Sequence, residues 1–263
     1  MNTRDNLVPE HYKQILTLTT QHLQNILKDK QKTTKTTYTL IREHKEKNTQ
    51  IAQETIWYDI IRRLNGNTLH WKKLWKHTYA SYNIGKTPDT LFLVLHNRIQ
   101  TRVKCKGRRL GYNVTCKICN THDETTMHMV AECSHACDLW EAFKTIYTRL
   151  LPNSPYIPHE VALTANLQHL DFRDKKSKLL RTVSEIILHE IWSARCKYEH
   201  ENIPPNINRS IQSVVTSLEK IIKTHYGHHS QQKTLHKFKN NFSIDNVICS
   251  IDHQSNLTIF LPP

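Results

Sequence analysis

The most informative segment of this sequence begins with Cys116-Lys-Ile-Cys119. After eight further residues comes His128, and after four more residues comes Cys133. Two residues between the first cysteines allow a tight turn to bring both thiolates to one metal ion. His128 and Cys133 would complete a tetrahedron from the start of the next helix, with Asp123 or Thr125 as its N-cap. The spacing therefore predicts one structural zinc ion held by Cys116, Cys119, His128 and Cys133.

Other side chains near this motif offer different ligand sets: Cys137, His122 and His135. Cys137 is the strongest rival, because it lies one helical turn after Cys133. Cys105 stands beyond a basic segment, and we expect it to be a bystander. Two further interpretations are a metal-free fold with buried thiols and a redox pair of cysteines. The redox pair is disfavoured, because no βαβ pattern surrounds these cysteines. Four protein ligands would leave no position for a catalytic water, so we expect the zinc to hold the fold.

The composition is that of a basic protein. The 263 residues include 37 Lys and Arg against 23 Asp and Glu, a formal net charge of +14. A field of this sign favours polyanions such as nucleic acid or an acidic membrane face. Five glycines argue against Gly-rich phosphate loops and turn-dense β-sandwiches. No apolar run approaches the roughly 18 residues of a membrane span. The N-terminus lacks the apolar stretch of a signal peptide, so we expect an intracellular protein, nuclear or cytoplasmic, that is neither secreted nor bound to a membrane.

Apolar periodicity predicts a mainly α fold, with helical bundle segments around a small Cys-Cys-His-Cys zinc knuckle and a short C-terminal β-hairpin. Residues 228–241 are polar and basic and are expected to be loose. The predicted helices cover residues 11–30, 39–64, 68–82, 87–103, 125–151, 171–200 and 207–226, and the hairpin strands cover 244–251 and 257–261.

Composition shifts and prolines divide the chain into four regions. Pro152, Pro155 and Pro158 make the clearest break. The predicted regions are a helical and linker N-terminal region (1–50), a zinc-binding domain with flanking helices (51–152), a proline-containing linker (153–170) and a helical C-terminal region with a polar basic tail (171–263).

A basic segment precedes and enters the knuckle. No Asp or Glu occurs from Thr90 to His122, and these 33 residues contain seven cations. Phosphate contacts from them would give affinity for nucleic acid without sequence specificity; the alternative is a solvated helix face with a basic loop. The seven cations, called here the knuckle belt, are Arg98, Arg102, Lys104, Lys106, Arg108, Arg109 and Lys117.

Two further groups invite a functional interpretation. Trp71 and Trp75 lie among lysines and could stack on bases, although their spacing of four favours helix packing. Four histidines near the C-terminus lack the regular spacing of the knuckle, and we interpret them as solvated side chains rather than as a second metal site: His225, His228, His229 and His236.

Several of these residues together resemble the reverse-transcriptase zinc-binding domain, which lies carboxyl-terminal to the polymerase in many non-LTR (LINE-type) retrotransposons. The resemblance covers about residues 71–140 and, more weakly, 187–200, where Ile191-Trp192-Ser-Ala-Arg195 is similar to a segment after the finger. It implies binding of RNA or target DNA during target-primed reverse transcription. Besides the four ligands it involves Trp71-Lys-Lys-Leu-Trp75, Leu91-Phe-Leu-Val-Leu-His-Asn-Arg98, Thr101-Arg102, Leu110, Glu124-Thr125 and Trp140.

The chain departs from such elements in lacking a Tyr-x-Asp-Asp polymerase signature and a Pro-Asp…Asp…Lys nuclease pattern after the finger. The leading hypothesis is therefore a non-catalytic nucleic-acid-binding zinc module derived from the C-terminal region of such a reverse transcriptase. RNA or DNA and a reverse transcriptase are the expected partners, with no small-molecule substrate. A zinc-stapled protein-interaction scaffold is one alternative. A magnesium-dependent nuclease using Asp171, Asp174 and Glu185 or Glu190 is the other.

Overall fold

The structure, a computed structural model, describes residues 81–83, 86–106, 113–153, 156 and 174–262, all within one compact unit that spans 66–263. The predicted helices over 11–30 and 39–64, most of 68–82, and both Trp71 and Trp75 lie outside the described residues. The domain boundaries proposed above stay predictions.

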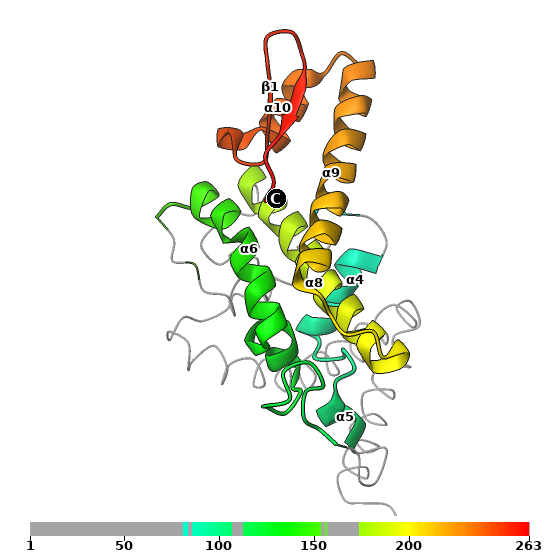
Figure 1. Cartoon of the computed structure of the whole chain (residues 1–263). Helices are drawn as coiled ribbons and strands as arrows, with labels where there is room; N and C mark the ends of the chain where they lie inside the picture. Colours follow the sequence, from blue (N-terminus) through cyan, green and yellow to red (C-terminus); the bar gives the residue numbers. More distant parts are fainter. Residues whose placement is uncertain (1–80, 84–85, 107–112, 154–155, 157–173, 263) are drawn as a thin grey trace, which may run out of the picture. The chain divides into compact units, whose positions relative to one another are not determined.

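The described part is mainly α-helical with one small antiparallel hairpin, as the sequence predicts (Figure 1). No helix in it is long and apolar enough to cross a membrane. Its elements are α4 (Lys86–Leu95), α5 (Arg102–Lys106), the π-helical turn η2 (His128–Glu132), α6 (Ser134–Leu150), α8 (Lys175–Glu201), α9 (Ile207–Gln231), α10 (Leu235–Phe242), the 3-10 turn η4 (Ile244–Asn246), β1 (Cys249–Ile251) and β2 (Leu257–Ile259).

Helix α8 is the centre of the core, because α4, α6, α9 and α10 all pack against it (Figure 1). Its apolar residues are buried on several sides, as expected for a helix enclosed by others. From α6, Tyr147 is buried against it and its hydroxyl lies 2.7 Å from that of Ser184. The predicted core residues are confirmed on both helices: Trp140, Phe143, Ile146, Tyr147, Leu179, Leu180, Val183, Ile186, Ile187 and Ile191.

The ends of α8 follow capping rules. Asp174 is the N-cap and its carboxylate accepts from the backbone N–H of Lys176 at 2.9 Å. Asn202 takes the left-handed conformation after the last turn, with φ of 56°, so the helix ends before Pro204.

The helix predicted over 87–103 is too long, since α4 ends at Leu95. Asn97 adopts a left-handed φ of 48°. Its N–H donates to the carbonyl of Val94 and the N–H of Arg98 donates to that of Leu93, the paired bonds of a Schellman motif. The chain then turns and re-enters a helix at α5, a change that the apolar pattern does not reveal.

Two predictions are wrong here: that residues 228–241 are loose, and that the helix starting at residue 207 ends at residue 226. Helix α9 continues through Gly227 to Gln231, and α10 folds back against it. Phe238 and Phe242 lie four residues apart on α10 and are almost fully buried. The ring of Phe238 packs edge-on to that of Tyr226, with centroids 5.7 Å apart. Two buried aromatic side chains thus hold an otherwise polar segment in place.

The predicted C-terminal hairpin is confirmed, although its strands are short. Strands β1 and β2 pair antiparallel with Cys249 opposite Ile259 and Ile251 opposite Leu257. The hairpin lies against α10, which contacts β1.

Candidate metal centre

The Cys116–Cys119 segment forms a tight knuckle closed by backbone hydrogen bonds. The N–H of Asn120 donates to the carbonyl of Cys116 at 2.9 Å, and the N–H of Cys116 donates to the carbonyl of His122 at 2.7 Å. Asn120 has a φ of 56°, a conformation that asparagine tolerates better than most residues. Thr115 and Asp123 pair as an antiparallel bridge beneath the knuckle. Both thiols are thereby aimed to one side of the loop.

His128 and Cys133 are brought to the same place by the π-helical turn η2. The N–H of Cys133 donates to the carbonyl of His128 at 2.7 Å, the i to i+5 bond that defines this turn. Because a π turn holds more residues than an α turn, side chains five apart lie on nearly the same face. The four-residue spacing between the last two ligands is thus explained by a π turn.

The unbroken helix predicted over 125–151 is therefore wrong. Cys133 has an extended backbone (φ −65°, ψ 141°) and separates η2 from α6 as its N-cap residue. The prediction that Thr125 caps the first turn is confirmed, because its hydroxyl accepts from the N–H of His128 at 3.0 Å. Asp123 instead lies in the bridge with Thr115.

The four predicted ligands form one cluster, with all ligand atoms within 4.8 Å of one another. The Sγ atoms of Cys116 and Cys133 are 3.8 Å apart, and Cys119 Sγ is 3.3 Å from His128 Nε2. Tetrahedral zinc with Zn–S bonds of about 2.3 Å sets its sulfur ligands about 3.8 Å apart. The donor set and its spacing therefore fit a Cys₃His zinc site.

Two of the three clustered thiols, those of Cys116 and Cys119, have a lowered pKa, whereas the hydrogen bond with Cys116 and burial raise the pKa of Cys133. Hydrogen bonding with Cys133 lowers the pKa of the Cys116 thiol against the opposing effect of burial, and a hydrogen bond with His128 lowers it further. Burial opposes ionisation of Cys119, but hydrogen bonds from the Thr121 hydroxyl and backbone N–H groups lower its pKa overall. Since thiolates are the metal-binding form, the lowered pKa values of Cys116 and Cys119 favour metal binding.

None of the rival ligands belongs to the cluster. The thiol of Cys137 donates to the carbonyl of Ala131 at 3.3 Å, and its residue is exposed. His135 is buried on α6, with Nε2 3.3 Å from the hydroxyl of Ser210 on α9. Nδ1 of His122 lies 2.8 Å from the hydroxyl of Thr121. Cys105 lies on α5, apart from the four ligands.

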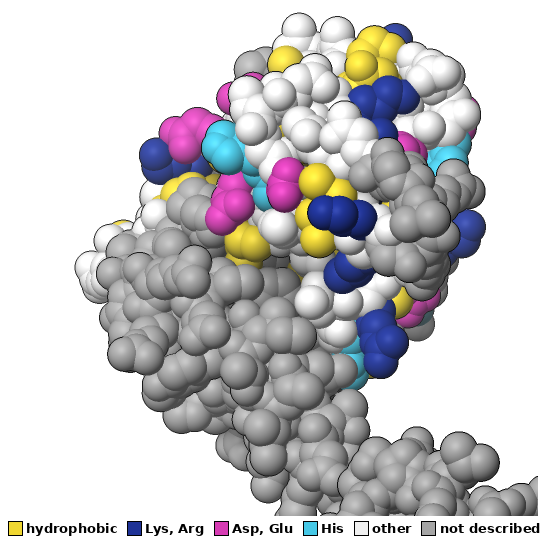
Figure 2. Space-filling view, turned by 90° about the horizontal axis from the view of Figure 1, so that it is seen from below, with side chains coloured by type: hydrophobic (Ala, Val, Ile, Leu, Met, Phe, Trp, Pro, Cys, Tyr) yellow, Lys and Arg dark blue, Asp and Glu magenta, His cyan; other side chains and the backbone are white. Residues whose placement is uncertain are grey.

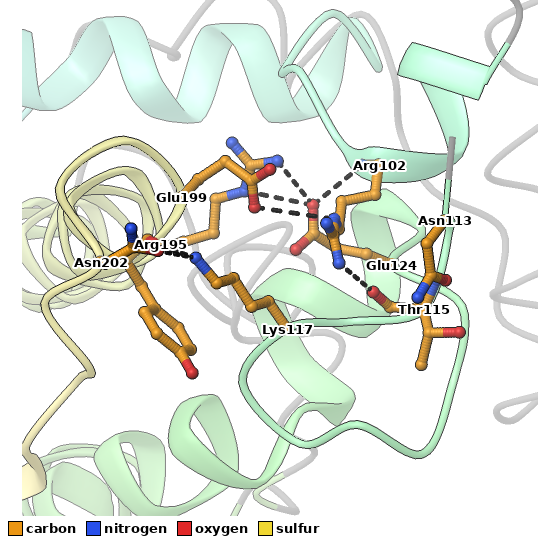
Figure 3. Close-up of polar contacts among 9 residues, drawn as sticks. Arg102, Asn113, Thr115, Lys117, Glu124, Arg195, Glu199 and Asn202 are labelled. Atoms are coloured by element: carbon orange, nitrogen blue, oxygen red, sulfur yellow. Dashed lines mark hydrogen bonds and ion pairs between the residues drawn. The ribbon is translucent and has the colours of Figure 1, made fainter. Parts of the chain in front are cut away.

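A buried ion pair joins Glu124, which lies between the ligands Cys119 and His128, to Arg195 of α8 (Figure 3). Glu124 and Arg195 have side chains only 1% and 5% exposed. The carboxylate Oε1 of Glu124 accepts from Arg195 Nη2 at 2.8 Å and Nε at 3.1 Å, and from the backbone N–H of Arg102 at 2.9 Å. Both residues belong to the resemblance seen in the sequence, but their pairing is not predicted from it, because 71 positions separate them.

Three cations of the knuckle belt are also committed to contacts within the protein. Arg102 Nη1 donates to the carbonyl of Thr115 at 2.8 Å, and its Nε lies 3.6 Å from the carboxylate of Glu199 (Figure 3). Lys117 Nζ donates to the carbonyl of Tyr198 at 2.7 Å and to Asn202 Oδ1 at 2.6 Å. Both side chains thus fasten the knuckle to the last turns of α8.

Lys104 is the most extensively bonded of these cations. Its ammonium donates to Asn97 O and Oδ1 at 2.6 and 2.7 Å, to Ile99 O at 2.9 Å and to Thr126 Oγ1 at 3.0 Å. Burial, with a smaller effect from Arg98, lowers its pKa to about 8. Lys104 therefore cross-links the turn after α4 to the segment that precedes η2.

Only part of the knuckle belt faces solvent. Arg98 and Lys106 are exposed, whereas Arg108 and Arg109 lie outside the described residues. Seen from below, the described surface shows Lys and Arg side chains interspersed with acidic, apolar and His side chains rather than gathered in one block (Figure 2).

The carboxylates of the nuclease alternative do not form a common site among the described residues. Asp174 caps α8, and Glu185 is buried where burial raises its pKa to about 7 and Asn83 donates to it at 2.9 Å. Glu190 lines a groove of about 430 Å³ between α8 and α9, and accepts from the hydroxyls of Ser210 and Ser213. Asp171 lies outside the described residues.

Comparison with known proteins identifies one family. Residues 33–140, less than half of the chain, match the family model described as zinc-binding in reverse transcriptase. The matched segment contains all four clustered ligands and ends at Trp140. No curated protein and no solved structure matches the chain.

Proposed function

We propose that this chain is a non-catalytic nucleic-acid-binding module whose knuckle is held by zinc, because residues 33–140 match the family model described as zinc-binding in reverse transcriptase. The Cys₃His cluster is the observation that carries this proposal. Its four protein ligands would fill a tetrahedral zinc, which suits a structural ion. The expected origin is the C-terminal region of a non-LTR retrotransposon reverse transcriptase, and the expected location is intracellular.

Nucleic acid is the proposed partner because the chain has a net charge of +14 and Arg98 and Lys106 are exposed beside the knuckle. Contacts of this kind are made to phosphates and are independent of sequence. A reverse transcriptase is a second expected partner, and no small-molecule substrate is proposed.

The test uses purified full-length protein. We expect one zinc ion per chain by metal analysis, and salt-dependent binding to single-stranded RNA and duplex DNA. Four phosphate contacts would give a log–log salt slope of about −3. Replacing Arg108 and Arg109 by Ala should flatten the slope by about one to two units without changing the zinc content.

A protein-interaction scaffold is the second candidate. The internal contacts of Arg102, Lys104 and Lys117 favour it, because these cations stabilise the fold. Absence of salt-dependent binding in the experiment above would select this candidate. Metal-dependent nicking of DNA by the intact protein would select the nuclease instead.

A further inference from the structure

The second half of α9 presents a cationic face to solvent. Four of the five residues on this face are exposed, and Gly227 is half-buried. The buried residues Leu218 and Ile222 lie on the opposite side of the helix. The members follow the i, i+3, i+4, i+7, i+8 spacing of a single helix face. This face, called here the α9 stripe, consists of Lys220, Lys223, Thr224, Gly227 and His228.

The sequence contains no acidic residue from the start of the α9 stripe to the end of α10, although Glu219 directly precedes the stripe. From Lys220 to Ile244 the chain has five Lys, four His and no Asp or Glu. Helix α10 packs against α9 and adds two exposed lysines, and a third exposed lysine lies in the turn between the two helices. Lys223 pairs with Glu219 of the preceding turn at 2.6 Å, an exposed contact of small value. Lys237 and Lys239 belong to α10, and Lys233 lies in the turn that precedes it.

The hairpin contributes one carboxylate near this end of α9. The hydroxyl of Tyr226 donates to the carbonyl of Ser255, which places the β1–β2 turn beside the helix. In that turn, Asp252 accepts from the backbone N–H and the side-chain amide of Asn256. The carboxylate of Asp252 is thus hydrogen-bonded within the β1–β2 turn.

Cations from three helices accumulate here. Burial first, and then the neighbouring His228, Lys237 and His236, lower the pKa of His229. Burial, His229, Lys178 of α8 and His228 likewise lower that of His225. Mutual repulsion of this kind disfavours the folded state, and a bound polyanion would relieve it.

Gly227 is a second and independent indication of a ligand. A glycine inside a helix is unfavourable relative to alanine. A Cβ placed on Gly227 would meet no atom of the described structure within 4 Å, so packing there does not require the absence of a side chain. One remaining use of glycine is to let a ligand approach the backbone closely.

We propose that the α9 stripe binds the phosphate backbone of a nucleic acid. Lys220 and Lys223 neutralise phosphates, and Gly227 lets the strand lie close to the helix. From Lys220 to His228 the stripe spans about 12 Å, a length over which one strand of a duplex presents about three or four phosphates. Lys220 and Thr224 also line the groove between α8 and α9, so the strand would run along its rim. The inference rests on the proposed function, but it locates the contact away from the knuckle.

The test measures binding of the full-length protein to a labelled mixed-sequence RNA single strand and to a DNA duplex over a series of salt concentrations. We expect the double variant Lys220→Gln and Lys223→Gln to flatten the log–log slope by about 1.4–1.8, at 0.7–0.9 per lost contact. A matched control removes two cations of α6, with Lys144→Gln and Arg149→Gln. Its slope should equal that of the wild type.

A steric variant tests the glycine without changing charge. Gly227→Ala should weaken binding, because its Cβ already holds the strand away from the backbone, and the longer side chain of Gly227→Gln should weaken binding severalfold more. Circular dichroism should show both variants as helical as the wild type.

The possible failures are separable. If the Arg108 and Arg109 variant loses affinity and the α9 variant does not, the stripe is not a binding surface, although the proposed function stands. Equal losses of affinity in the α9 and α6 variants would mean that binding depends only on the net charge of the protein. That result would overturn the proposal that the α9 stripe is a binding surface. Binding to vesicles containing anionic phospholipid but not to RNA or DNA would overturn both proposals.

Discussion

The two basic regions of this protein look alike in sequence and differ in structure. The segment from Thr90 to His122, which holds the knuckle belt, and the segment from Lys220 to Ile244 both lack acidic residues. Each contains five or more Lys and Arg. In the knuckle belt, Arg102, Lys104 and Lys117 bond to carbonyl, carboxylate and amide oxygens of the protein. On α9 and α10 the lysines are exposed.

A stretch of sequence without acidic residues therefore does not reveal whether its Lys and Arg side chains are exposed or bonded within the protein. Apart from the side-chain amide oxygen of Asn97, the oxygens that engage the knuckle belt come from beyond the stretch or from the backbone. Glu199 lies nearly one hundred positions after Arg102, and Tyr198 supplies a carbonyl. A sequence window records charge composition, whereas exposure depends on the tertiary contacts that other segments make.

The largest expected effect comes from removing a zinc ligand of the knuckle. This change would disrupt the contacts by which cations of the knuckle belt hold the knuckle to α8. Cys119→Ser should abolish zinc binding, whose apparent free energy in small fingers is about 10–16 kcal/mol. Residues 113–133 should then lose hydrogen-exchange protection. The last turns of α8 should loosen as well, because Lys117, Arg102 and Glu124 hold them to the knuckle. Metal analysis and hydrogen exchange measure both effects.

Cys137→Ser is the matched control for that experiment. Cys137 lies near the cluster but outside it, so this variant should retain one zinc ion and wild-type exchange. Zinc loss from Cys137→Ser, or zinc retained by Cys119→Ser, would contradict the ligand assignment.

The next effect tests the buried pair that joins the knuckle to α8. Arg195→Met leaves the carboxylate of Glu124 buried without its ionic partner, and should lower the free energy of unfolding by about 3–5 kcal/mol. Lys144→Met breaks the exposed pair with Glu141 and should cost at most about 0.5 kcal/mol. Urea unfolding compares the two variants. Similar costs would mean that the Glu124–Arg195 contact does not fasten the knuckle.

The candidate site was predictable from the sequence because its residue types and spacing are themselves chemical constraints. Four ligands at fixed separations predict a tetrahedral cluster, and the structure brings these four together. The break at Cys133 was not predictable in the same way. Apolar residues continue in helical register through η2 and α6, while the change of backbone conformation falls on a ligand that carries no such signal.

The remaining errors have a common physical origin in tertiary contacts. Residues 228–241 are mostly polar, and only burial of Phe238 and Phe242 against α9 makes them a folded helix. The pairing of Glu124 with Arg195 joins two segments that have no local pattern in common. Local propensity and periodicity are blind to both.

A smaller effect separates the two basic regions directly. Lys104→Gln removes an ammonium with four acceptors, and should lower the free energy of unfolding by about 1–3 kcal/mol. Its affinity for nucleic acid, measured on the folded protein, should stay within error. Lys220→Gln should do the reverse, leaving stability unchanged and flattening the salt slope by about 0.7–0.9. Both variants are measured by urea unfolding and fluorescence anisotropy. A flattened slope in Lys104→Gln would remove the distinction between the regions.

The smallest expected effect concerns Gly227 on the α9 stripe. Since a Cβ at this position meets nothing within 4 Å in the described structure, Gly227→Ala should gain the helix propensity of alanine at no steric cost. The expected gain is about 0.5–1 kcal/mol, which for a chain of this size raises Tm by about 1–4 °C. Thermal unfolding without nucleic acid measures the effect of Gly227→Ala on stability separately from its effect on binding. A lower Tm would show that the fold itself requires glycine here, and the argument that the position is kept open for a phosphate backbone would then fail. A higher Tm would leave ligand approach as the reason for a residue that weakens its own helix.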